Sequence, residues 1–144
     1  MSLKFVTPPD APTPVGPYSP AVVAGNLVFV SGQAGRNPAT RQIAPDVETQ
    51  TEQTLRNIET ILKGAGSSLS RVIRCGVFLV DIKEFAKMNA VYSRVFDGHR
   101  PARTTVEVSA LPEPDLRVEI DAVALIEKDE GGRMKVLSSC RVSN

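Results

Sequence analysis

The sequence predicts an α+β domain in which two helices cover one face of a mixed β-sheet. Two long segments carry apolar residues at helical spacing, and five shorter segments are rich in β-branched and apolar residues. These segments follow one another in the order ββαβαββ, which is typical of helices packed on one side of a sheet. The 144 residues suffice for one core without disulfides. We expect one domain over residues 1–127 and a flexible tail over residues 128–144, where little is apolar.

An irregular arm and a hairpin are expected first. Residues 7–20 contain six of the eleven prolines, which fix φ angles and remove backbone donors. Two short apolar segments follow, residues 21–24 and 27–30. Gly25 and Asn26 separate them and tolerate the positive φ of a tight turn, so we predict a β-hairpin.

Two helices are predicted from periodicity and from their ends. In residues 46–63, apolar positions recur three and four apart, Asp46 is a suitable N-cap, and the glycines of segment 64–68 end the helix. This segment follows a helix and lacks the lysine of a phosphate loop, so helix termination is its expected role. A second helix begins at Asp81, which together with Glu84 resembles a capping box. Its apolar stripe comprises Ile82, Phe85, Met88, Tyr92, Val95 and Phe96.

Three further strands are predicted. Residues 72–80 are β-branched and apolar, with Cys75 expected in the core. Residues 102–108 and 116–126 each alternate in polarity and are expected to pair as an antiparallel hairpin. That register brings three pairs together on one polar face, with Arg103 and Glu119 as diagonal neighbours: Arg103 with Asp121, Thr105 with Glu119, and Glu107 with Arg117. The face is either a solvated ladder of ion pairs or a pocket wall buried against another subunit, and alternation alone does not decide.

Composition argues against several classes of protein. The formal net charge is +1, so the chain lacks the basic excess typical of proteins that bind nucleic acid or anionic membranes. We find no apolar run long enough for a signal peptide or a membrane span, and we expect a cytoplasmic protein. The lone His99 and the two cysteines form no cluster with metal-ligand spacing, so neither a metal site nor a disulfide framework is expected.

Six short motifs follow one another along the chain. They are Gly16-Pro17-Tyr18-Ser19, Ser31-Gly32-Gln33, Pro101-Ala102-Arg103, Val106-Glu107-Val108, Leu111-Pro112 and Val118-Glu119-Ile120. In this order and spacing, over residues 4–127, they resemble the Rid/YjgF/UK114 family of reactive intermediate deaminases, also called endoribonuclease L-PSP. The resemblance implies a chorismate-mutase-like subunit in a homotrimer whose pockets lie between neighbouring subunits. It also implies hydrolysis of enamines and imines such as 2-aminoacrylate and 2-iminopropionate to 2-keto acids and ammonia, without a cofactor.

The resemblance assigns roles to matching residues. It implies that Arg103 holds the carboxylate of an imino acid substrate, that Glu119 positions or deprotonates the attacking water, and that Tyr18 closes the pocket. Four further residues are implied to contact the substrate: Ser31, Gly32, Thr105 and Asn89. Thr105 stands where well-studied bacterial members have cysteine, so no thiol chemistry is expected there. From the residues alone, structural roles stay open for Tyr18 as an anchor of the arm, Ser31 as a strand cap, Glu119 in an ion-pair ladder and Asn89 in helix packing.

Three alternatives to a general deaminase stay open at this point. A deaminase specific to one catabolic pathway would retain the same arginine, because any small carboxylate substrate fits it. A metabolite-binding trimer would use the same pocket without turnover. An endoribonuclease or translation inhibitor is the third, but the near-neutral charge and the absence of a basic aromatic surface argue against RNA as the main partner.

Overall fold

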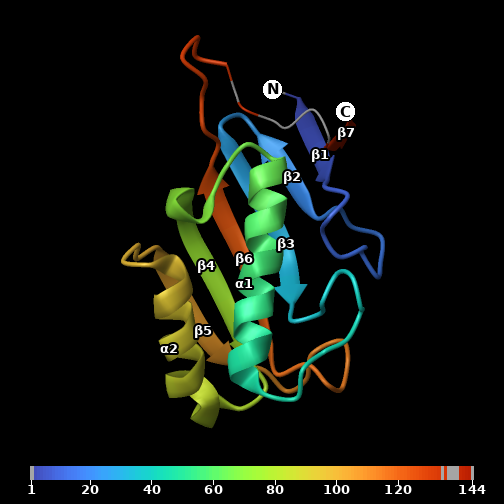
Figure 1. Cartoon of the computed structure of the whole chain (residues 1–144), viewed down its shortest axis with the longest axis vertical. Helices are drawn as coiled ribbons and strands as arrows, with labels where there is room; N and C mark the ends of the chain where they lie inside the picture. The colour runs from blue at the N-terminus through green and yellow to red at the C-terminus, as the bar shows by residue number, and fades with distance from the viewer. Residues whose placement is uncertain (1, 134, 136–139, 144) are drawn as a thin grey trace.

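Seven strands form one mixed sheet in the computed structural model, which describes residues 2–133, 135 and 140–143, and both α-helices pack on the same face of it (Figure 1). The strand order is β5-β4-β6-β3-β2-β1-β7. The elements are β1 (Leu3–Thr7), β2 (Ala21–Ala24), β3 (Leu27–Ala34), α1 (Val47–Gly64), β4 (Val72–Leu79), α2 (Phe85–Phe96), β5 (Ala102–Glu107), β6 (Val118–Leu125) and β7 (Arg141–Ser143). The predicted α+β architecture is confirmed, and one further strand lies at each end of the predicted order.

The first helix begins and ends where its terminal residues predict. Asp46 has extended backbone angles, and its Oδ2 accepts a hydrogen bond from the backbone N of Thr49 at 2.8 Å. Such an N-cap contributes about 1 kcal/mol. After the last turn, Gly66 adopts a φ of 81°, which favours glycine and turns the chain away from the helix axis. Helix termination at segment 64–68 is therefore confirmed.

The second helix is preceded by a short 3-10 turn. Asp81 caps this turn, Ile82–Glu84, by accepting a hydrogen bond from the backbone N of Lys83 at 2.9 Å. The proposed capping box is not formed, because the Glu84 carboxylate instead accepts a hydrogen bond from Nε of Arg117 at 2.7 Å. The sequence pattern could not reveal this partner, which comes from the distant segment before β6.

The pairing of β5 is the main error of the sequence prediction. β5 pairs with β4 in parallel, and β6 pairs with the other edge of β4 in antiparallel, so β5 and β6 do not form a hairpin. The segment between them crosses the end of β4, where Val108 N donates to Leu79 O at 2.8 Å and Val80 N donates to Arg117 O at 3.1 Å. The helical connection through α2 explains the parallel pairing, because parallel strands need a long crossover.

This topology separates the two polar faces that were expected to coincide. Arg103 lies opposite Cys75, and Thr105 lies opposite Val77. Both partners are fully buried under the helices, so Arg103 and Thr105 also face the helices. Glu119 lies on the opposite face, since its neighbour Ile120 is fully buried in the core. The three predicted cross-strand pairs are therefore absent: Arg103 with Asp121, Thr105 with Glu119, and Glu107 with Arg117.

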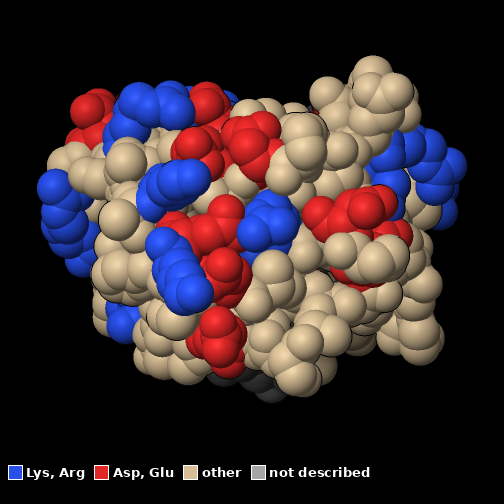
Figure 2. Space-filling model, turned by 90° about the horizontal axis from the view of Figure 1, so that it is seen from below, with Lys and Arg blue, Asp and Glu red and all other residues tan. Residues whose placement is uncertain are grey.

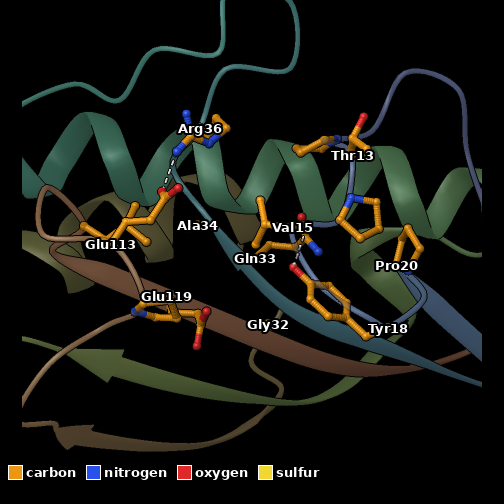
Figure 3. A pocket seen from close by; sticks show the side chains of 14 residues that line it. Thr13, Val15, Tyr18, Pro20, Gly32, Gln33, Ala34, Arg36, Glu113 and Glu119 are labelled. Carbon is orange, nitrogen blue, oxygen red and sulfur yellow. Dashed lines mark hydrogen bonds and ion pairs between the residues drawn. The ribbon is translucent and has the colours of Figure 1, made fainter.

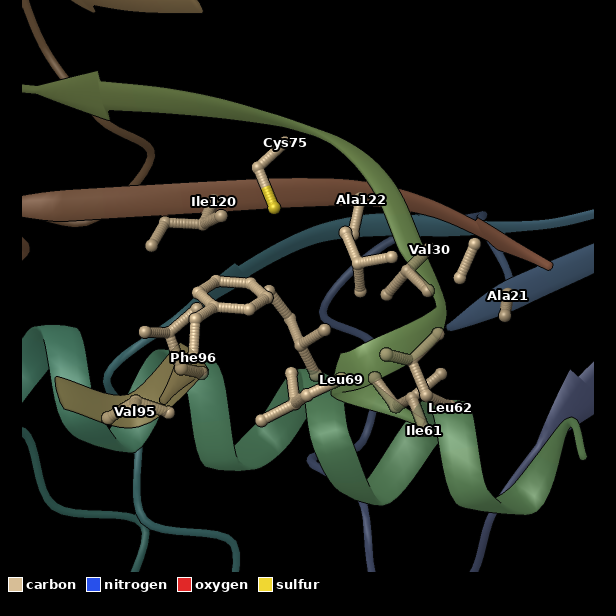
Figure 4. Close-up of a cluster of buried hydrophobic side chains, with 14 of the residues drawn as sticks. Ala21, Val30, Ile61, Leu62, Leu69, Cys75, Val95, Phe96, Ile120 and Ala122 are labelled. Atoms are coloured by element: carbon tan, nitrogen blue, oxygen red, sulfur yellow. The ribbon is translucent and has the colours of Figure 1, made fainter. Parts of the chain in front are cut away.

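The core lies between α1 and the sheet. In Figure 4, Ile61 and Leu62 of α1 point toward the sheet strands that carry Ile120 and Ala122, and Cys75 lies in the same cluster, as predicted. None of the helices among the described residues is long and apolar enough to cross a membrane.

The two ends of the chain meet at one edge of the sheet. β1, for which the sequence indicated no strand, pairs with β2 on one side and with β7 on the other. Cys140 precedes β7 and is buried against Gly64, where an added Cβ would lie 3.4 Å from its sulfur. Residues 134, 136–139 and 144 lie outside the described residues, and the flexibility of residues 128–144 stays a prediction.

Candidate active site

A cavity of about 90 Å³ opens where the proline-rich arm crosses the end of β3 (Figure 3). Its walls come from the arm, from the end of β3 and from the segment leading into β6. The lining residues include three predicted site residues: Tyr18, Gly32 and Glu119. Ser31 lies just beside this wall, and its Oγ donates a hydrogen bond to Ser19 O at 2.6 Å, which ties the arm to β3.

The position of Tyr18 is compatible with both roles considered for it, anchoring the arm and closing the pocket. Its hydroxyl oxygen accepts a hydrogen bond from Val15 N at 3.3 Å, so the side chain anchors a turn of the arm (Figure 3). Tyr18 also lines the cavity, and the residue is 45% exposed, so it remains accessible to a ligand.

Glu119 is a half-buried carboxyl group with a shifted pKa. Burial raises its pKa above the usual range, and the nearby charge of Asp121 raises it further. None of the ion pairs among the described residues includes Glu119. A carboxyl group of this kind is suited to accept and return a proton.

Gly32 makes room for this carboxyl group. A Cβ built on Gly32 would lie 2.9 Å from Cδ of Glu119, closer than such atoms normally approach. The strand is irregular here, since the register with β6 shifts between Val30 and Gln33. Glycine at this position therefore lets β3 pass directly beside the Glu119 carboxylate.

The other predicted site residues, Arg103 and Thr105 on β5 and Asn89 on α2, lie on the helix side of the sheet. The guanidinium carbon of Arg103 lies 4.7 Å from the ring centroid of Tyr92. No carboxylate among the described residues forms an ion pair with Arg103. Two polar atoms here are buried and have no hydrogen-bond partner in the part of the chain that the structure describes, Oδ1 of Asn89 and Oγ1 of Thr105. The Thr105 hydroxyl, two residues from Arg103 on the same face of β5, is a donor that suits a bound anion, whereas Oδ1 of Asn89 can only accept a hydrogen bond.

The two groups lie on opposite faces of the sheet. Tyr18, Gly32 and Glu119 line the cavity, whereas Arg103 faces the helices from β5. The expectation that Arg103 and Glu119 are diagonal neighbours is wrong for a single chain, because β4 separates their strands and the side chains point to opposite sides.

A sequence model of the Endoribonuclease L-PSP family matches residues 8–126. The chain belongs to the Rid/YjgF/L-PSP family. The match covers every predicted site residue and ends before the segment that leads to β7. The chorismate-mutase-like YjgF/L-PSP fold predicted from the motifs is shown as well, by superposition on solved YjgF/L-PSP structures with TM-scores of 0.80 and 0.81.

Relatives and solved structures of the Rid/YjgF/L-PSP family resemble almost the whole domain. A RutC family protein of Pyrococcus horikoshii is 49% identical over 119 residues, which is 82% of this chain and 94% of that protein. A 2-iminobutanoate/2-iminopropanoate deaminase of Bos taurus is 41% identical, with 85% of this chain and 89% of that protein covered. The crystal structure of E. coli TdcF with bound serine superposes with a TM-score of 0.81 at 37% identity, covering 85% of this chain and 98% of that one.

Two buried amides of α1 shape the cavity of this Rid/YjgF/L-PSP chain, and the sequence analysis missed both. Gln50 Nε2 donates to Ala44 O at 2.7 Å and to Asp115 O at 2.9 Å, while its Oε1 accepts from Arg117 N at 2.8 Å. Asn57 similarly donates to two backbone oxygens at the end of β3. The sequence did contain a signal for these two residues, since both are amides on the inward face of an amphipathic helix. Buried amides need hydrogen-bond partners within the protein.

Replacing Gln50 by leucine is expected to lower the free energy of unfolding by about 2 kcal/mol, since the fully buried Gln50 side chain is the hydrogen-bond partner of three backbone groups. Equilibrium denaturation in urea measures the change. Arg56→Ala, on the exposed side of the same helix, is the matched control and should change the free energy by less than about 0.5 kcal/mol. Equal decreases in the free energy of unfolding in the two variants would show that Gln50 has no special role in holding the backbone at residues 44, 115 and 117.

Proposed function

We propose that this chain hydrolyses reactive enamines and imines of small amino acids to 2-keto acids and ammonia, as a deaminase of the 2-iminobutanoate/2-iminopropanoate type. The observation that carries the proposal is that neither Arg103 nor Glu119 forms an ion pair among the described residues, which leaves a guanidinium to hold a carboxylate and a half-buried carboxyl group to accept a proton. The 41% identity to a bovine protein named for this activity supports it.

The proposed reaction needs only groups that the chain supplies. Arg103 binds the substrate carboxylate through two parallel N–H donors, with Asn89 and Thr105 beside it. Glu119 accepts a proton as water adds to the carbon of the protonated imine, giving a neutral tetrahedral carbinolamine. Glu119 then returns this proton to the nitrogen. The C–N bond breaks as the hydroxyl group gives its proton to Glu119, so that the keto acid forms and ammonia leaves. The sum is one imine and one water converted to one keto acid and one ammonia.

We infer that each site is built from two copies of the chain within a homotrimer. One copy contributes Arg103 and the adjacent copy contributes Glu119, because the two side chains face opposite sides of the sheet within a single chain. The sheet face without helices supports this, since Phe29 is 45% exposed and Val106 is 40% exposed there. Large apolar side chains on an uncovered sheet face are typical of surfaces that bind another subunit.

The activity is tested with the unstable substrate generated in the assay mixture. A pyridoxal-phosphate serine dehydratase generates 2-aminoacrylate, semicarbazide traps the remaining imine, and keto-acid release is followed in parallel. We expect this protein to accelerate imine decay above the spontaneous rate. If a correctly folded protein binds keto acids but leaves the decay of several small imino acids unchanged, the protein binds metabolites and is not a deaminase. If it accelerates the decay of one particular imine alone, it is a pathway-specific enzyme.

The pH dependence of this activity should reveal Glu119. Burial and Asp121 raise its pKa, so the side chain keeps its proton to a higher pH than an ordinary glutamic acid, near 4.3. Because the ionised form accepts the proton, kcat/KM is expected to fall on the acid side at a pH above that value. Asp121→Asn removes one cause of the raised pKa, so the fall should move to lower pH. If the fall of kcat/KM at acid pH is unchanged in Glu119→Gln, the titrating group is a residue other than Glu119.

RNA cleavage, which the family name suggests, is not favoured by the charge distribution. On the end of the molecule shown in Figure 2, Lys and Arg side chains are interspersed with Asp and Glu, and the formal net charge of the chain is +1. A nucleic-acid site usually gathers one sign of charge. We also propose a cytoplasmic location, for which the two unpaired cysteines are the support.

A further inference from the structure

The guanidinium of Arg103 lies against a stripe of side chains on α2. Its carbon is 4.7 Å from the ring centroid of Tyr92 and 5.6 Å from that of Phe85, and Nη1 is 4.0 Å from Sδ of Met88. Tyr92 and Phe85 are two helical turns apart, so they present their rings from the same side of the helix. Half of the apolar stripe predicted for this helix therefore contacts a charged group in addition to the core.

Tyr92 differs from an ordinary core residue. The side chain is 8% exposed, and its hydroxyl is buried without a hydrogen-bond partner among the described residues. Burial raises the pKa of Tyr92, with the Cys75 thiol as its polar neighbour, so the phenol stays neutral and its ring keeps an electron-rich face. A cation above such a ring is attracted to it, and the attraction grows as water is removed.

This contact uses the face of the Arg103 guanidinium and not its N–H donors, of which one, on Nη1, is directed to Sδ of Met88. A ring binds the flat face of a guanidinium, whereas the N–H groups point outward in its plane. A carboxylate partner within the protein would occupy those same N–H groups, and none of the ion pairs among the described residues includes Arg103. The aromatic contact thus restricts the orientation of the cation without competing with a ligand.

We propose that Tyr92 is a positioning residue that holds the plane of the Arg103 guanidinium so that its N–H groups are aligned for a substrate carboxylate. This rests on the proposed function, in which Arg103 binds that carboxylate. Phe85 contributes less, because its ring is farther from the cation and is 40% exposed. Tyr92 acts through Arg103 and does not itself take part in the reaction.

A spectroscopic test decides the contact whether or not the protein is a deaminase. In the NMR spectrum of the wild-type oligomer, the ring current of Tyr92 should shift the resonance of the Arg103 Nε–H proton upfield. This resonance is assigned by its disappearance in Arg103→Lys. Tyr92→Phe should keep the shift, and Tyr92→Leu should abolish it. Phe96→Leu is the matched control, since Phe96 is a buried aromatic residue on α2 whose ring centroid lies 4.6 Å from that of Tyr92. An unchanged resonance in Tyr92→Leu, or an equal loss in Phe96→Leu, overturns the proposal.

A binding test decides the function of the contact. Calorimetry with pyruvate, the keto acid formed from 2-iminopropionate, should give a Kd about fivefold higher for Tyr92→Leu and within about twofold of wild type for Tyr92→Phe. In an Arg103→Ala background, Tyr92→Leu should have no further effect, because the two residues act as a unit. Additive losses contradict the proposal. Pyruvate binding that is normal in Arg103→Ala instead contradicts the proposed carboxylate site, while the spectroscopic result still stands for Tyr92.

Discussion

Arg103→Ala is expected to lower kcat/KM for small imino acids by about 100-fold. A bidentate, charge-assisted pair between a guanidinium and a carboxylate contributes up to about 3 kcal/mol, and each 1.4 kcal/mol corresponds to a factor of ten in rate. Arg103 is free to form that pair, because its described contacts are with aromatic rings and a thioether. Initial rates of keto-acid release with semicarbazide trapping measure the loss.

Two controls separate binding from folding in this experiment. Arg103→Lys keeps the positive charge but lacks the planar fork, so it should recover only a small part of the lost activity. Thermal unfolding of both variants should stay close to wild type, since Arg103 is only partly buried and makes no ion pair among the described residues. Full activity in Arg103→Lys would mean that charge alone suffices and that no bidentate pair forms.

Mixed oligomers of two inactive variants are expected to regain activity. Arg103→Ala keeps Glu119, and Glu119→Gln keeps Arg103. If adjacent subunits share each site, a complete site forms wherever a Glu119→Gln subunit supplies Arg103 to the correct neighbouring Arg103→Ala subunit. In a cyclic trimer that contains both variants, one of the three sites is complete, so the purified mixed oligomer should have about a third of the wild-type rate. Co-expression with two different affinity tags and tandem purification provides the mixed oligomer for the rate assay.

The opposite outcome is equally clear. If Arg103 and Glu119 of the same chain formed a site, no subunit in the mixture would carry both, and the mixed oligomer would be as inactive as either variant alone. A second mixture of Arg103→Ala with Arg103→Lys serves as the control, because it lacks an intact Arg103 in every subunit and should show no more than the residual activity of Arg103→Lys.

The candidate site was predicted residue by residue, but not its arrangement. Arg103, Glu119 and Tyr18 stand in motifs of consecutive residues, which the sequence displays directly. Their distribution over two faces depends on which strand β5 pairs with, and charge complementarity with β6 suggested the wrong partner. Gln50 illustrates the same limit, because its three backbone partners lie in loops that only the folded chain brings to α1.

The sequence by itself determined the features that depend on neighbouring residues. The ends of α1 follow from the Asp46 cap and the positive φ at Gly66, and the buried stripes follow from helical and strand periodicity, all of which act over a few residues. Only the tertiary structure decided the parallel place of β5 at the edge of the sheet, the aromatic contact of Arg103 and the opposite faces of Arg103 and Glu119. The pairing of distant strands is set by the crossover helix and by burial of the whole core, which a local pattern of alternating charges does not report.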